Sequence, residues 1–88
     1  MVTKRQVLRF MRVQRVPVTV GGLAESLSIT QRAAELRLLK LWRARLIEPA
    51  SKGWRRQALR EIGFQISARG AARLDYWELA ARQGSSDG

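Results

Sequence analysis

Residues 23–38 read LAESLSITQRAAELRL, and the spacing of their apolar side chains predicts two helices that pack across a short turn. Leu23 and Leu27 are one helical turn apart, so they face the same side of the first helix. Ile29 is expected to fill the turn, and Leu38 returns the following helix to the same core. This spacing is typical of two helices that cross near a right angle.

Short sequence signals predict five more elements around this pair. Thr3, Thr19 and Thr30 stand where the N-caps of three helices are expected. A β-branched run that contains Pro predicts a very short edge strand, and alternating apolar residues further along predict a half-buried strand. The expected helices cover residues 3–14, 20–27, 30–45 and 68–82, and the expected strands cover residues 16–20, 46–51 and 58–67.

The resulting fold class is mainly α with a small β-hairpin, in the order α-β-α-α-β-β-α. The 88 residues suffice for one hydrophobic core, so we expect a single domain over residues 1–82. Residues 83–88 (QGSSDG) contain no apolar side chain and are expected to form a disordered tail.

The chain is strongly basic, with 17 Lys and Arg against 7 Asp and Glu and a net charge of +10. Residues 1–60 hold 14 basic and 3 acidic side chains, whereas residues 61–88 hold 3 basic and 4 acidic ones. Such a one-sided field attracts a polyanion. Composition alone leaves open whether that partner is nucleic acid, an anionic membrane or an acidic protein.

The residue types that several functions need are missing from the sequence. There is no Cys and no His, which excludes zinc-finger ligand sets, disulfides and imidazole bases. The carboxylates form no metal or acid–base motif, and no GxxxxGK loop is present to bind a nucleotide. We therefore expect a protein that is not an enzyme and holds no metal or cofactor. No apolar run reaches the roughly 18 residues of a membrane span, which predicts a cytoplasmic protein.

Two longer stretches carry a resemblance to a known family. The first is LAESLSITQRAAELRLLKLWRARLI at residues 23–47, and the second is GFQISARGAARL at residues 63–74. Together with the order of elements, they resemble the winged helix-turn-helix family, in particular small bacterial and archaeal regulators of the MarR and PadR kind. Ser28 and Arg45 stand at two positions where that family usually has Gly.

The resemblance implies a DNA-binding transcriptional regulator associated with the nucleoid. In this family the third helix enters the major groove, and a hairpin wing, here residues 52–60, contacts the DNA backbone or the minor groove. Carried over by position, the groove-facing residues would be Gln31, Arg32, Ala33, Leu36, Arg37 and Lys40, with Thr30 and the helix N-terminus at a phosphate. The wing would place four cations on phosphates: Lys52, Arg55, Arg56 and Arg60.

The chemistry of these side chains favours double-stranded DNA on separate grounds. Arg makes two parallel hydrogen bonds to guanine, Gln makes them to adenine, and Ala or Leu contacts a thymine methyl. Glu35 would repel phosphates if it pointed toward them. Trp54, within the wing, is expected either to cover the hairpin or to make an exposed contact.

Leu36 and Leu39 leave alternatives open. On a helical wheel Leu36 lies among the basic residues, opposite the core side, and Leu39 is intermediate. An exposed Leu pair favours either thymine-methyl contacts or a protein partner. The alternatives are a winged-helix module that binds an acidic protein through Leu36 and Leu39, and a sequence-neutral architectural nucleic-acid binder.

The last predicted helix has two apolar sides. The family usually forms dimers, often through terminal helices, so the resemblance implies a homodimer contact here, although a chain this short also fits a monomer. The residues expected at that contact are Leu74, Tyr76, Trp77 and Leu79. Two third helices in a dimer would address half-sites one turn apart and predict an inverted-repeat target.

Overall fold

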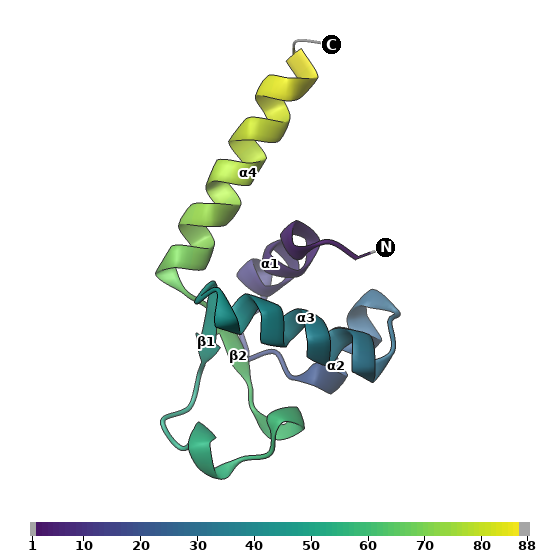
Figure 1. Cartoon of the computed structure of the whole chain (residues 1–88), viewed down its shortest axis with the longest axis vertical. Helices are drawn as coiled ribbons and strands as arrows, with labels where there is room; N and C mark the ends of the chain where they lie inside the picture. Colours follow the sequence, from purple (N-terminus) through teal and green to yellow (C-terminus); the bar gives the residue numbers. More distant parts are fainter. Residues whose placement is uncertain (1, 87–88) are drawn as a thin grey trace.

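The computed structural model describes residues 2–86, and the side chains of residues 2–82. This part of the chain is mainly helical with one antiparallel hairpin, as predicted. In Figure 1, α1, α2 and α3 lie together, and α4 extends away from them. The helices are α1 (Lys4–Val13), α2 (Val20–Leu27), α3 (Gln31–Arg43) and α4 (Ala68–Ser86), and the strands are β1 (Ile47–Pro49) and β2 (Phe64–Ile66).

Each of the three predicted N-caps is present. The Thr3 side chain accepts a hydrogen bond from the Gln6 amide at 3.2 Å, which starts α1. Thr19 and Thr30 accept at 3.1 Å from backbone amides three residues further on, which starts α2 and α3. Each bond satisfies a first-turn amide that lacks a partner inside the helix, so the sequence alone located these helix starts.

The core lies where α1, α2, α3 and the hairpin meet. Phe64 of β2 is fully buried and packs edge-on against Trp42 of α3, with ring centroids 5.2 Å apart. Leu23 and Leu38, expected to share a core across the turn, are both fully buried. The two helices of residues 23–38 therefore contribute to the same core, as the spacing of their leucines predicted.

The predicted edge strand over residues 16–20 is wrong in extent. Only Val18 pairs with the hairpin, exchanging two 2.8 Å backbone hydrogen bonds with Phe64. Pro17 has no backbone N–H, and Thr19 turns at once into the cap of α2, so pairing stops after one residue.

The predicted strand over residues 58–67 is also shorter than expected. Its first half forms a 3₁₀ turn, Leu59–Glu61, and a similar turn covers Trp54–Arg56. The last hydrogen bond across the hairpin runs from the Ala50 amide to the Gly63 carbonyl at 2.8 Å. Residues 50–63 therefore form a wide β1–β2 loop. Within it, the two 3₁₀ turns provide hydrogen-bond partners for backbone amides and carbonyls.

Helix α4 is longer than predicted, because it continues past Arg82 to Ser86. Residues 83–86 of the predicted tail are thus helical, and residues 87–88 lie outside the described part. None of the helices described between residues 2 and 86 is both long and apolar enough to cross a membrane.

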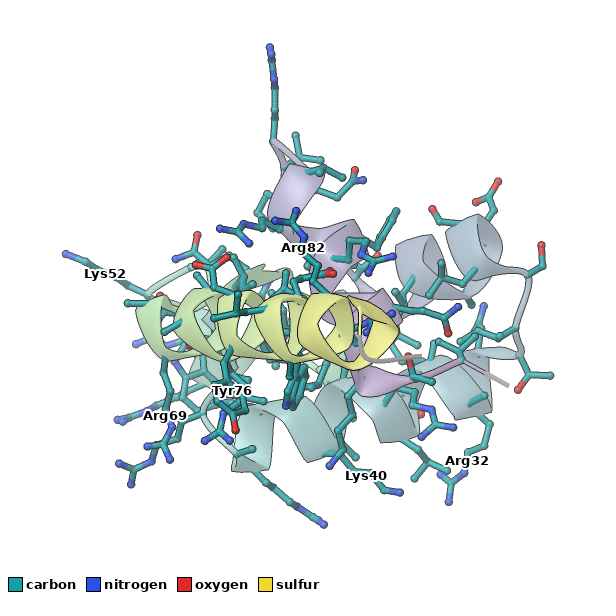
Figure 2. All side chains as sticks on the ribbon, turned by 90° about the horizontal axis from the view of Figure 1, so that it is seen from above. Arg32, Lys40, Lys52, Arg69, Tyr76 and Arg82 are labelled. Atoms are coloured by element: carbon teal, nitrogen blue, oxygen red, sulfur yellow. The ribbon has the colours of Figure 1, made fainter. Side chains whose placement is uncertain are left out.

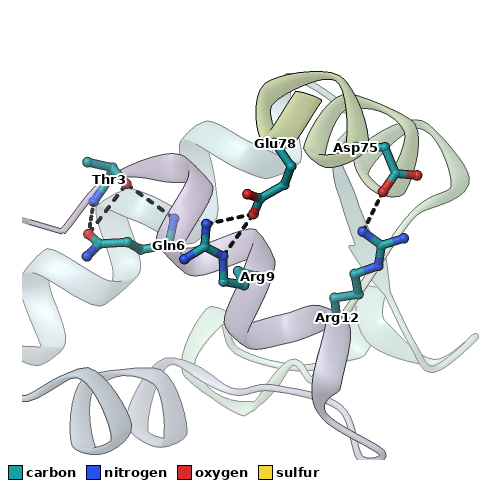
Figure 3. A network of polar contacts seen from close by, with 6 residues as sticks. All are labelled: Thr3, Gln6, Arg9, Arg12, Asp75 and Glu78. Atoms are coloured by element: carbon teal, nitrogen blue, oxygen red, sulfur yellow. Dashed lines mark hydrogen bonds and ion pairs between the residues drawn. The ribbon is translucent and has the colours of Figure 1, made fainter. Parts of the chain in front are cut away.

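Two ion pairs attach α4 to α1 (Figure 3). Arg9 donates through Nε and Nη2 to one carboxylate oxygen of Glu78, at 2.9 and 2.7 Å. One turn further along, Arg12 donates to Asp75 at 2.6 Å. That hydrogen bond and the charge of Asp75 raise the pKa of Arg12. Both acidic residues of α4 between Ala68 and Arg82 thus face α1.

The start of α4 packs tightly against the segment that follows α3. Ser67 donates its hydroxyl to the Arg45 carbonyl at 2.7 Å and accepts from the Gly70 amide at 2.9 Å. A Cβ at Gly70 would collide with the backbone carbonyl of Leu46. Only glycine fits, which gives a physical reason for the Ser-x-x-Gly spacing seen in the sequence.

Two non-glycine residues adopt left-handed backbone conformations. Ser28 ends α2 with φ of 55°, and Arg45 follows α3 with φ of 62°. These are the two positions where the winged helix-turn-helix pattern usually has glycine. Glycine adopts this left-handed conformation without steric cost, whereas Ser28 and Arg45 each have a Cβ that makes it less favourable.

Candidate nucleic-acid interface

The exposed side of α3 carries most of the residues expected to contact DNA. Ala34, Leu38 and Leu41 are buried, so the opposite side of the helix faces solvent. Figure 2 shows Arg32 and Lys40 projecting from that side. We call this the α3 face; its exposed members are Gln31, Arg32, Leu36 and Lys40, and its half-buried members are Ala33 and Arg37.

A shallow hollow of about 170 Å³ lies in the middle of the α3 face. Ala33 and Leu36 supply its apolar part, and Arg37 and Lys40 supply its cations. Leu36 is 43% exposed, whereas Leu39 is half-buried, so the structure does not expose the two leucines equally. A hollow lined by both apolar side chains and cations fits a thymine methyl next to phosphates or guanine.

Glu35 is enclosed by cations and does not project freely from the α3 face. Its side chain is only 17% exposed. Arg60, from the β1–β2 loop, approaches the carboxylate to 3.6 Å, and Arg32 approaches it to 3.8 Å. The negative charge of Glu35, which was expected to repel phosphates, is therefore offset by the positive charges of Arg32 and Arg60.

Arg60 also reaches the first residue of α3. Its Nη1 donates a hydrogen bond to the side-chain oxygen of Gln31 at 3.2 Å. One guanidinium thus joins the β1–β2 loop to Gln31 and Glu35. The sequence predicted that Arg60 contacts a phosphate. In the structure its guanidinium contacts Gln31 and Glu35 of α3.

The other wing cations are distributed differently. Lys52, Arg55 and Arg56 are exposed. Lys52 projects from the end of the molecule opposite Arg32 (Figure 2). The α3 face and Arg60 therefore form one cluster, which does not include Lys52.

Trp54 attaches the loop to the body of the protein. Its ring packs edge-on against Trp42 with centroids 5.0 Å apart, and the Arg55 guanidinium lies 5.5 Å above the Trp54 ring. Of the two roles considered for Trp54, covering the hairpin or making an exposed contact, the structure favours the first. The pair fixes the loop relative to α3, because Trp42 belongs to that helix.

The set expected at a dimer contact is divided by the fold. Leu74 is 1% exposed and belongs to the core, and Trp77 is half-buried against it. Leu74 is therefore committed to packing within one copy, which corrects the expectation for this residue, whereas Trp77 keeps part of its surface exposed. Tyr76 and Leu79 are 65% and 55% exposed.

Two cations that the sequence analysis did not single out stand on the free side of α4. Arg69 and Arg73 are exposed and line a hollow with Ala72 and Tyr76. Their spacing of four residues was a visible signal, since it puts both on one side of a helix. Arg69 and Arg73 were not singled out because residues 61–88 together have more acidic than basic side chains.

No cluster of three or more potential metal ligands occurs in the part of the chain that the structure describes. Comparison with models of protein families, with curated proteins and with solved structures found no match. The function of this protein is therefore inferred from its residues and their geometry.

Proposed function

We propose that this protein is a winged helix-turn-helix transcriptional regulator that binds double-stranded DNA through the α3 face. The observation that carries the proposal is a hollow on the exposed side of α3 that is lined both by apolar Ala33 and Leu36 and by the cations Arg37 and Lys40. The compensation of Glu35 supports it, because no free negative charge opposes phosphates there.

The roles of the residues follow from their chemistry. Arg32 and Arg37 recognise guanine, Gln31 recognises adenine, and Leu36 contacts a thymine methyl. Lys40 and the exposed loop cations Arg55 and Arg56 neutralise phosphates.

The proposed DNA-binding unit is one copy of the chain. Specific protein–protein interfaces bury roughly 1,200–2,000 Å². Tyr76 and Leu79 are the members of the expected dimer set that remain exposed, and two side chains supply only a small part of that area. Sedimentation of the free protein tests this, because a stable dimer would restore the inverted-repeat target.

The exposure of Leu36 also supports a second candidate, a protein-interaction module for an acidic partner. The two functions differ in what they require. A protein module loses its partner on Leu36→Asp and keeps it when Arg55 and Arg56 are both changed to Ala. A DNA regulator is weakened by both changes.

The deciding experiment is selection from random duplex DNA at about 150 mM salt, where purely electrostatic binding is suppressed. A regulator enriches a short motif, and Arg37→Ala then relaxes the preference at one position of it. Binding without enrichment would instead indicate a sequence-neutral architectural protein. Absence of binding would overturn the proposal in favour of the protein module.

A further inference from the structure

The charges of α4 are separated onto two sides of the helix. Its acidic residues Asp75 and Glu78 pair with Arg12 and Arg9 of α1 (Figure 3). The acids of this helix between Ala68 and Arg82 are therefore engaged on the α1 side. Its free side, in contrast, presents cations.

That free side forms a compact surface, which we call the α4 face: Arg69, Ala72, Arg73 and Tyr76. These residues line a hollow of about 430 Å³. Arg69 and Arg73 are four residues apart, or about 6 Å along the helix axis. Tyr76 is 65% exposed one turn further on, where its hydroxyl can donate a hydrogen bond.

The α4 face lies on the same side of the molecule as the α3 face. Figure 2 shows Arg69 and Tyr76 pointing to the side that carries Lys40 and Arg32. Arg82, on the same helix, points the opposite way. In Figure 1 the start of α4 lies beside the end of α3, where the Ser67 hydroxyl donates to the Arg45 carbonyl, so the α4 face begins near the C-terminal end of α3.

We infer that the α4 face is a second phosphate-binding surface, which contacts the backbone of the same DNA duplex beyond the segment held by α3. This inference rests on the proposed function and extends it. A DNA strand carries one charge every ~3.4 Å along the axis, so two cations about 6 Å apart along α4 span about two phosphate steps of one strand. The Tyr76 hydroxyl donates to a third phosphate oxygen.

A second copy of this chain suits the α4 face less well than DNA does. A symmetric contact would bring Arg69 and Arg73 of two copies toward each other, and like charges oppose such a contact. The acids of α4 cannot compensate, because they are held by Arg9 and Arg12. Charge complementarity therefore selects a polyanion.

The test compares salt-dependent binding of the selected DNA motif by the intact protein and its variants. The double variant Arg69→Ala/Arg73→Ala removes two phosphate contacts. We expect the slope of log K against log [salt] to fall by about 0.9 for each contact, and affinity at 0.15 M salt to fall roughly fivefold for each. The DNA target must extend several base pairs beyond the selected motif on both sides.

Three controls isolate the effect. Arg82→Ala removes a charge from the same helix on the opposite side and should leave the slope unchanged. Arg69→Lys/Arg73→Lys keeps the charges and should retain most of the slope. Thermal unfolding of each variant verifies the fold, since exposed Arg side chains contribute little stability.

The outcomes separate the two proposals. If wild-type protein binds DNA and the double Ala variant binds with the same slope, the α4 face does not contact DNA and only this inference is overturned. A change in sedimentation with an unchanged slope would overturn it in favour of self-association. If the wild-type protein does not bind DNA, the proposed function fails first and the inference fails with it.

Discussion

The Arg60 guanidinium lies 3.6 Å from the Glu35 carboxylate and joins the β1–β2 loop to the exposed side of α3. The same side chain donates a hydrogen bond to Gln31 at 3.2 Å. Glu35 also lies 3.8 Å from Arg32, so it engages two cations at once. The acid thereby holds two cations and, through Arg60, links the β1–β2 loop to the α3 face.

Replacement of Glu35 by Gln is expected to strengthen DNA binding. Arg32 and Arg60 would be released from the carboxylate, so binding to arbitrary duplex DNA should rise roughly fivefold per cation that gains a phosphate. Glu25→Gln is the matched control, because it removes an exposed acidic charge from α2. Titration of unrelated duplexes checks this, and equal effects of the two changes would show that only net charge matters.

Replacement of Gly70 by Ala should destabilise the protein by about 3 kcal/mol or more, because the new methyl would overlap the Leu46 carbonyl. Gly21→Ala is the contrasting change, since nothing lies within 4 Å of the added methyl in α2. It should stabilise the protein by about 1 kcal/mol through helix propensity. Urea unfolding measures both, and similar effects would contradict the close approach at Gly70.

Replacement of Arg45 by Gly is expected to stabilise the protein by about 0.5–1 kcal/mol, because glycine adopts a φ of 62° without strain. Arg43→Gly removes the same charge at the last residue of α3 and should cost about 1 kcal/mol. Opposite shifts of the unfolding midpoint would bear out the left-handed conformation. Loss of stability in both would count against it.

Replacement of Trp54 by Ala should lower stability by about 1–3 kcal/mol, because the edge-on contact with Trp42 is lost. Trp54→Phe keeps a ring at this position and should lose less. The remaining tryptophan fluorescence should shift to the red as Trp42 gains water. If unfolding midpoints and spectra stay unchanged, the loop is not attached through this pair.

Much of the fold was determined locally and could be predicted. Thr3, Thr19 and Thr30 cap their helices because a hydroxyl placed before a helix satisfies amides within three residues. The alternation of Ile62, Phe64 and Ile66 predicted that these side chains share one side: Ile62 and Phe64 are buried and Ile66 is half-buried, although only residues 64–66 form the strand. The side chain of Ile62 still faces the core, because the 3₁₀ turn that replaces the first half of the expected strand lies against the same core.

The candidate site was predicted less completely. The α3 face follows from helical periodicity, so its members could be named from spacing. Arg60 was assigned to phosphate because sequence shows a charge but not its partner 25 residues away. Arg69 and Arg73 were overlooked, because only the pairing of Asp75 and Glu78 with α1 shows that the cations of α4 stand free.

The sequence by itself determined the starts of α1, α2 and α3, the core side of α3 and the one-sided positive charge, since each depends on neighbours within a few residues or on composition alone. Tertiary structure decided the partner of Glu35, the commitment of Leu74 to the core and the common side shared by Arg69 and Lys40. These depend on how α4 and the β1–β2 loop pack against α1 and α3. Such packing joins residues distant in the chain, and no local spacing encodes it.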